Sequence, residues 1–472
     1  MSKLPVLPNP PKGVQLGLKC PQAVLFLDLT FRGNLAPVFQ KVYGINYSPS
    51  YIAYDATEKS WDFTNNEFNR YISPELNAEK VAQKFITTTH RTAKQLIRIA
   101  QIVSSPSRWR KSHIKQDLLE DLNLYWNTYE EHTICSYVFW AVEHLLMDSL
   151  TDELNKAGFK TEVESGLPTF IFPSDPNWFA LESQDLEVLK SRFSNTGEEE
   201  MKKAAAFHAE MFGFMSTPYQ LGTRTSCEDM FARMKQAIAP PVENKMKPLD
   251  GFPENIMRLG ELVRELAYLK SERIDTYALA DFYATPMYKC LSDVLGIPLN
   301  LIFCMTRDEI TRAITDKEDI LIETLKQRDT KYCMALIDGT IKFYQPTETG
   351  LFGRKKYEVA KKGDVLSGMA TSPGKAKGRV RILSMDEREP EFDSDEIIVT
   401  SMTRPELGGA LDVALAYATD EGGRLCHAAI VSREKKKPCV TALKEATKVL
   451  RTGMIIEVDG SVGTVTVVDD NF

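Results

Sequence analysis

The sequence contains no apolar run long enough to cross a bilayer. Its longest largely apolar stretch, residues 134–142, ends at Glu143 and His144, whereas a membrane-spanning helix needs about 20 apolar residues. Residues 1–13, MSKLPVLPNPPKG, show no apolar core of the kind that directs export. We therefore expect a protein without membrane contact, in which residues 134–142 form a buried helix.

Closely spaced cysteines are also lacking. The eight cysteines form no Cys-x-x-Cys pair, and both structural zinc sites and secreted disulfide frameworks depend on such spacing. His132 and His144 are twelve residues apart, whereas the histidine pair of a helical metal site is four apart. No metal site is predicted, and the cysteine usage is typical of the reducing cytoplasm.

Positive charge is not in excess. The chain has 58 basic and 65 acidic side chains and a net charge of −7 at pH 7, whereas a nucleic-acid surface needs a basic stripe. The basic runs at 354–356 and 435–437 are only three residues long, and we interpret both as solvated turns. No nucleic-acid partner is expected.

The sequence shows no glycine-rich opening of the kind that begins an ATP-grasp domain, although it has 26 glycines. Residues 1–344 also do not alternate strand with helix, as a (β/α)₈ barrel would. We therefore expect neither an ATP-binding domain nor a barrel within this sequence, and no tightly bound cofactor.

Helical periodicity dominates the first 344 residues. Apolar residues recur at spacings of three and four, the pattern of an amphipathic helix. The aromatic-rich second segment is interpreted as a helical core, with a ligand pocket as the less favoured alternative. The predicted helices are residues 76–106, 118–154, 198–214, 226–238 and 255–284.

Two of the following three features allow more than one interpretation, and the segment 301–309 has one. Residues 23–27 fit a strand or a short buried helix. Residues 301–309 resemble a strand that feeds a helix capped by Thr306 and Glu309. The basic residues of the 255–284 helix either hold an anion or, as we favour, pair with neighbouring glutamates.

Residues 345–363 are turn-rich and are predicted to be a linker. After it, short strand-like segments at 378–380, 396–399 and 438–441 are separated by turns and one compact helical run. The sequence therefore predicts a mainly helical domain at 1–344 and a small α/β domain at 364–472.

The most informative segment is residues 419–434, TDEGGRLCHAAIVSRE. Gly422 and Gly423 form a turn, and His427 then opens the helical run. Glycine turns and helix N-termini present backbone N–H groups that bind anions, and a neutral imidazole is a good nucleophile. This combination favours a histidine that accepts a phosphoryl group over an ordinary structural histidine.

The segment resembles the phosphohistidine motif of the swivelling domain of phosphoenolpyruvate-utilising enzymes. That family includes phosphoenolpyruvate synthase, pyruvate phosphate dikinase and rifampicin phosphotransferase. The resemblance continues over 364–472, and a weaker likeness to rifampicin phosphotransferase covers 255–344. The motif positions shared with the family are Thr419, Gly422, Gly423, Cys426, His427, Ala428, Ala429, Ile430, Val431, Arg433, Glu434 and Pro438.

The resemblance implies a phosphotransferase, a kinase-like phosphoprotein, in which His427 is the catalytic carrier of the phosphoryl group. ATP and Mg²⁺ would act through a separate ATP-grasp partner, and the helical domain would bind a small-molecule acceptor. The layout is similar to the rear part of rifampicin phosphotransferase, so the enzyme would be incomplete without that partner. The residues expected to hold the phosphate are Thr419, Gly422, Gly423, Arg433 and Thr403.

The motif departs from the family at two places. Leu425 stands where the family often has a threonine that is phosphorylated for control in some members, so that control is not expected. Lys435–Lys437 replace an apolar loop, near a helix end where positive charge suits the helix dipole. The alternative function is a non-catalytic binding or regulatory module that keeps the swivelling fold.

We expect the purified chain neither to bind ATP tightly nor to hydrolyse it, because its sequence shows no ATP-grasp signature. Titration calorimetry with MgATP measures the binding, and a phosphate-release assay measures hydrolysis. Micromolar ATP binding by the chain alone would contradict the assignment of ATP to a separate partner.

Overall fold

The computed structural model forms two compact units. The first comprises residues 1–149, 174–238 and 268–354, and the second residues 150–173, 239–267 and 355–472. The predicted domain boundaries stay a prediction, because residues 346–356 of the linker lie outside the described residues. The structure describes residues 15–19, 23–43, 51–55, 60–63, 77–164, 167, 169–170, 173, 175–176, 178–193, 197–216, 226–228, 230–231, 248–316, 321–345, 357–383, 392–403, 407–423 and 426–470.

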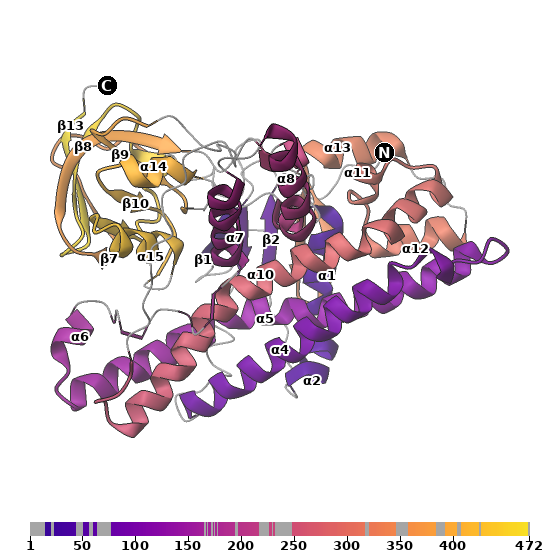
Figure 1. The fold of residues 1–472 in the computed structure, drawn as a ribbon, viewed down its shortest axis with the longest axis horizontal. Helices are drawn as coiled ribbons and strands as arrows, with labels where there is room; N and C mark the ends of the chain where they lie inside the picture. The colour runs from indigo at the N-terminus through magenta and orange to yellow at the C-terminus, as the bar shows by residue number, and fades with distance from the viewer. Residues whose placement is uncertain are drawn as a thin grey trace. The chain divides into compact units, whose positions relative to one another are not determined.

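Helices form most of the first unit, whereas α6 and the adjoining ends of α5 and α10 are counted with the second. Figure 1 shows the long helices α4, α5 and α10 side by side. The helices are α1 (Val24–Gly33), α2 (Ala36–Tyr43), α4 (Ala78–Val103), η1 (Pro106–Arg108), α5 (Ile114–Lys156), α6 (Lys160–Glu164), α7 (Trp178–Phe193), α8 (Glu198–Phe212), η2 (Gly213–Ser216), α10 (Glu254–Leu295), α11 (Leu299–Ile302), α12 (Arg307–Thr315) and α13 (Ile322–Thr330).

The predicted helices at 76–106, 118–154 and 198–214 are confirmed as α4, α5 and α8. The helix predicted at 255–284 continues to Leu295 as α10, with Pro286 inside it. Residues 23–27 belong to helix α1. Most of the helix predicted at 226–238 lies outside the described residues.

The strand predicted at the start of 301–309 is wrong, because Leu299–Ile302 form helix α11. A short apolar run does not distinguish a strand from a buried helix. The cap that follows is confirmed. The Thr306 hydroxyl accepts from the Glu309 N–H at 3.3 Å, and the Glu309 carboxylate accepts from the Thr306 N–H at 2.9 Å.

Aromatic side chains of α5 and α10 form the core of the first unit. Trp126, Tyr129 and Tyr277 are buried, which confirms the interpretation of the aromatic segment as core at these positions. His132 lies in this core with its Nδ1 2.9 Å from the Thr92 Oγ1. Burial lowers the pKa of His132 to about 3, so its imidazole stays neutral there.

The first unit also contains an antiparallel sheet that the helical prediction missed. Its order is β1-β3-β2-β4-β5, so the chain returns to this sheet after the long helices. Asp338 and Gly339 join β4 to β5 with positive φ angles of 47° and 75°, as a tight Asp-Gly hairpin requires. The strands are β1 (Gln15–Lys19), β2 (Tyr51–Asp55), β3 (Ser60–Phe63), β4 (Cys333–Ile337) and β5 (Thr340–Tyr344).

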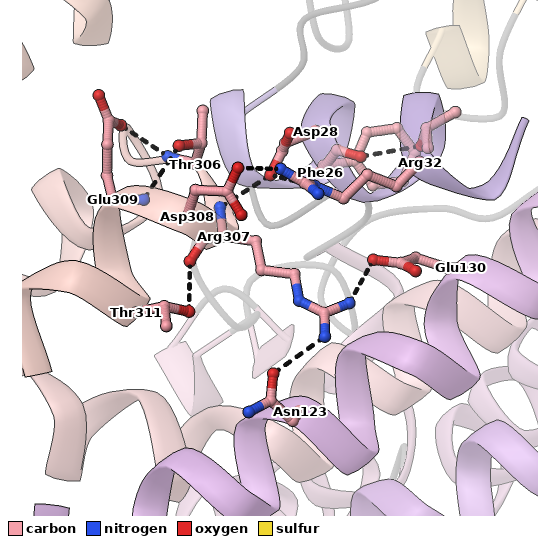
Figure 2. A network of polar contacts seen from close by, with 11 residues as sticks. Phe26, Asp28, Arg32, Asn123, Glu130, Thr306, Arg307, Asp308, Glu309 and Thr311 are labelled. Atoms are coloured by element: carbon pink, nitrogen blue, oxygen red, sulfur yellow. Dashed lines mark hydrogen bonds and ion pairs between the residues drawn. The ribbon is translucent and has the colours of Figure 1, made fainter. Parts of the chain in front are cut away.

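Arg307 joins three helices of the first unit (Figure 2). Its guanidinium donates to the Glu130 Oε1 at 2.6 Å and the Asn123 Oδ1 at 2.9 Å, both on α5. Its backbone N–H donates to the Asp28 Oδ2 of α1 at 2.8 Å. Burial raises the pKa of Glu130, and the Arg307 charge opposes that shift. The buried carboxylates here are therefore stabilised by a cation.

The second unit contains an eight-stranded sheet in the order β6-β13-β12-β8-β9-β10-β11-β7. Strands β8, β9, β10 and β11 run parallel. In Figure 1, α14 and α15 lie beside this sheet. The elements are β6 (Val365–Ser367), β7 (Met369–Ser372), β8 (Lys375–Leu383), β9 (Glu396–Thr400), α14 (Gly408–Val413), β10 (Tyr417–Thr419), α15 (His427–Glu434), β11 (Cys439–Thr441), α16 (Ala446–Val449), β12 (Ile455–Asp459) and β13 (Thr464–Asp469).

The parallel strands are buried on both faces. Along β9, Ile397 and Val399 pack in one apolar cluster and Ile398 in another. Along β10, Ala418 and Tyr417 divide between the same two clusters. Side chains of a strand alternate between faces, so both faces are covered, as is usual for parallel sheets. Among the described residues, no helix has both the length and the apolar character needed to cross a membrane.

We expect Arg307→Met to lower the free energy of unfolding by about 3 kcal/mol, because the change leaves Glu130 partly buried without its cation. The matched control is Lys326→Met, which also removes one positive charge from the first unit. Lys326 and Glu323 form an exposed pair with N and O atoms 3.5 Å apart, and its loss should cost less than about 1 kcal/mol. Denaturant unfolding followed by tryptophan fluorescence measures both, and equal effects would contradict the structural role of Arg307.

Candidate functional site

All the predicted site residues except Arg433 belong to segments at one edge of the parallel sheet. Strands β9, β10 and β11 end at Thr400, Thr419 and Thr441, and Thr419 lies opposite Thr400 in the parallel register. Thr403 is buried in the loop that follows β9. Ligands of open α/β sheets bind outside the carboxyl ends of the strands, so this edge is a suitable place for a phosphoryl site.

The turn that follows β10 is held against its neighbour. The Asp420 N–H donates to the Thr400 carbonyl at 3.1 Å, and the Glu421 N–H donates to the Ser401 carbonyl at 2.9 Å. The Thr419 hydroxyl donates to the Glu421 carbonyl at 2.6 Å. Because a hydroxyl has one proton, Thr419 in this conformation supports the turn and does not donate to a phosphate.

The fold requires glycine at position 422 but not at position 423. Gly422 has a φ of +123°, and a Cβ there would lie 2.7 Å from the Cys426 Sγ, so the fold itself needs glycine. A Cβ at Gly423 would meet no atom of the described residues within 4 Å. Packing of the described residues therefore does not explain the second glycine, whereas close approach of a ligand to the backbone would.

Helix α15 begins at His427, directly after this turn. Its N-cap is Cys426, whose Sγ accepts from the Ala429 N–H at 3.4 Å, and the Cys426 N–H donates to the Gly423 carbonyl at 3.1 Å. Thiol sulfur is a weak acceptor, so this cap is weak. The start of α15 thus combines the positive end of a helix dipole with a glycine turn.

Asp420 is a supporting residue that the sequence did not reveal. It is buried, and its carboxylate accepts from the Thr447 N–H at 3.1 Å and from the Thr447 hydroxyl. These contacts hold the start of α16 against the turn. A carboxylate that faced a bound phosphate would repel it. The two hydrogen bonds instead direct the Asp420 carboxylate to α16.

The loop after β11 closes the other side of the turn. The Leu443 N–H donates to the Thr419 carbonyl at 3.0 Å, and the Lys444 N–H donates to the Asp420 carbonyl at 2.8 Å. Ala442 and Lys444 have positive φ angles of 57° and 68°, each a strained conformation that costs on the order of 1 kcal/mol. Strained backbone of this kind concentrates at functional sites.

Thr441 is a second residue that the sequence did not single out. Its side chain is buried, and in the described part of the chain its Oγ1 has no hydrogen-bond partner. The Thr441 Cβ lies 3.4 Å from the position that a Gly422 Cβ would occupy. The signal available in the sequence was a threonine at the end of each of the three strands.

Arg433 lies apart from the other predicted phosphate residues. It stands in the last turn of α15, and six residues of helix place it about 9 Å along the axis from His427. Burial raises the pKa of the Cys439 thiol to about 12, and the positive charge of Arg433 opposes that shift. Cys439 is the first residue of β11, so the positive charge of Arg433 acts at the amino end of β11.

Comparisons with known proteins identify relatives of the C-terminal part of the chain. Residues 392–463 match the family model of the PEP-utilising enzyme, mobile domain. A probable phosphoenolpyruvate synthase of Archaeoglobus fulgidus is 36% identical over 168 residues, 34% of this chain and 22% of the relative. Phosphoenolpyruvate synthases of Pyrococcus furiosus and Aeropyrum pernix are 46% and 43% identical over 108 and 110 residues, each covering 23% of this chain and 13% of the relative.

Residues 392–463 are therefore similar to the mobile domain of the phosphoenolpyruvate-utilising enzyme family, which confirms the resemblance inferred from the motif. The chain spans less than a quarter of the length of these relatives.

We expect Gly422→Ala to destabilise the second unit by about 2 kcal/mol, because the new Cβ meets the Cys426 Sγ in a strained conformation. Gly423→Ala is the matched control, and it should change the unfolding free energy by less than about 0.5 kcal/mol. Denaturant unfolding of both variants tests this. Equal losses of stability would show that Gly423 is also required by the fold.

Proposed function

We propose that this chain is a phosphotransferase component in which His427 carries the phosphoryl group. The observation that carries the proposal is the position of His427 at the start of α15, after a glycine turn and at the carboxyl edge of a parallel sheet. The match to the mobile domain and the relatives named phosphoenolpyruvate synthase support it.

The proposed chemistry is a transfer to nitrogen. An unprotonated ring nitrogen of His427 attacks the phosphorus, the bond from phosphorus to the donor oxygen breaks, and that oxygen leaves with the electron pair. Backbone N–H groups at the helix start stabilise the added negative charge. The same positive dipole end disfavours the imidazolium form, so it keeps the nucleophile neutral before transfer.

We further propose that a separate protein with an ATP-grasp fold charges His427, using ATP and Mg²⁺. The first unit would then bind the small-molecule acceptor. The mobile domain would travel between the two sites as a rigid body. This division of labour accounts for a sequence that contains the carrier and a helical unit but shows no ATP-grasp signature.

We expect His427→Ala to abolish phosphotransfer and to leave the chain folded. Wild-type protein incubated with labelled ATP and a candidate ATP-grasp protein should acquire a label that acid removes and alkali spares, as a nitrogen–phosphorus bond requires. His113→Ala is the control, because this histidine is exposed in the first unit.

Two results would contradict this proposal. Full transfer by His427→Ala would exclude the carrier role, and unfolding of that variant would favour a structural histidine. A wild-type chain that stays unlabelled with every ATP-grasp protein tried would favour the alternative, a binding or regulatory module.

A further inference from the structure

A small cavity lies within the first unit, between helices α4, α7 and α10. Its volume is about 190 Å³. A cavity of about 150 Å³ is enough to bind benzene, so this one fits a ligand with a single ring. Its lining consists of Ile97, Pro176, Trp178, Leu181, Tyr268, Glu272, Asp275, Thr276 and Leu279.

One stripe of α10 supplies the polar lining. Tyr268, Glu272, Asp275, Thr276 and Leu279 follow one another at helical spacing and so share one face. The Thr276 hydroxyl donates to the Glu272 carbonyl of its own helix at 2.8 Å. The two carboxyl groups are therefore the groups on this stripe best placed to bind a ligand.

Asp275 is a buried carboxyl group that has no cation among the described residues. It is 5% exposed, and its Oδ2 has no hydrogen-bond partner within the described residues. Burial, and then the negative charge of Glu272, raise the pKa of Asp275 to about 7. By contrast, buried Glu130 has Arg307 at 2.6 Å, and buried Asp281 accepts from the Tyr125 hydroxyl at 2.9 Å. An unpaired buried carboxylate is costly, so Asp275 differs from a structural carboxylate.

Two aromatic side chains, Trp178 and Tyr268, contribute to the lining. Trp178 packs against Phe214 with ring centroids 5.1 Å apart, and this contact fixes its indole. The Tyr268 ring lies 6.5 Å from the His90 ring between centroids. His90 in turn places its Nδ1 3.6 Å from the Glu272 Oε2. Aromatic faces and carboxylates together are the side chains that recognise ammonium groups.

We propose that this cavity binds a small organic ammonium compound, whose charged nitrogen donates to Asp275 and Glu272 and whose apolar part lies against Trp178 and Tyr268. The ammonium group would supply the cation that Asp275 lacks, and the ring faces would add cation–π attraction. This inference goes beyond the phosphocarrier role and does not depend on it.

Binding should strengthen with pH. An ammonium group prefers the ionised Asp275, whose pKa near 7 leaves it largely protonated at pH 6. His90 and Glu272 also face this region, and protonation of either at low pH would weaken cation binding in the same direction. We therefore expect affinity to be about tenfold lower at pH 6 than at pH 8.

The test compares two probes of similar shape. Benzylamine is a cation at pH 8, and benzyl alcohol is neutral. Titration calorimetry of the full chain should show benzylamine binding at least about tenfold tighter than benzyl alcohol. Asp275→Asn should remove that preference, whereas Asp293→Asn should keep it, because Asp293 is exposed and lies further along the same helix.

A stability measurement distinguishes a binding role from a structural one. The raised pKa of Asp275 means that the native state loses stability as this carboxyl ionises, between about pH 4 and about pH 7. Asparagine does not ionise, so Asp275→Asn should unfold at the same or a higher temperature than wild type at pH 8. Glu272→Gln provides a second variant and should also weaken benzylamine binding. Equal affinity for both probes, no benzylamine binding, or a destabilised Asp275→Asn that keeps the preference would each overturn the proposal.

Discussion

The second unit depends on the parallel alignment of β9, β10 and β11. These strands are buried on both faces, and parallel pairing brings their carboxyl ends, and the loops that follow them, to one edge. The loops at that edge hold one another through backbone bonds, such as the Leu443 N–H to the Thr419 carbonyl at 3.0 Å. The edge therefore positions the turn and the start of α15 with little freedom.

Different residues at this edge have different tasks. Gly422, Thr419 and Asp420 shape and hold the turn through their conformation and hydrogen bonds. Gly423 is the position where the described contacts leave room for a ligand, and His427 begins α15 after this turn. The strained φ angles after β11 are stabilised by the same backbone network, which supports a site that is organised before its ligand arrives.

Buried carboxyl groups of the first unit occur in two kinds of environment. Around Arg307, carboxylates from α1 and α5 receive hydrogen bonds from the side chains of Arg32 and Arg307 and from a backbone N–H (Figure 2). Such groups hold helices together. At the cavity beside α10, Asp275 has neither a cation nor a partner for its Oδ2 in the described structure. Groups with a strongly shifted pKa in a cavity are more typical of binding sites than of scaffolds.

The sequence by itself determined the features that depend on neighbouring residues. The Thr306–Glu309 cap, helices α4 and α5, and the turn before His427 follow from local patterns, and the mobile domain follows from one contiguous motif. The tertiary structure alone decided what depends on distant segments. Strand β4 pairs with β2 across most of the first unit's sequence, and the apolar run at α11 became helical through its surroundings. The cavity of Asp275 needs three separate helices, so no local pattern could reveal it.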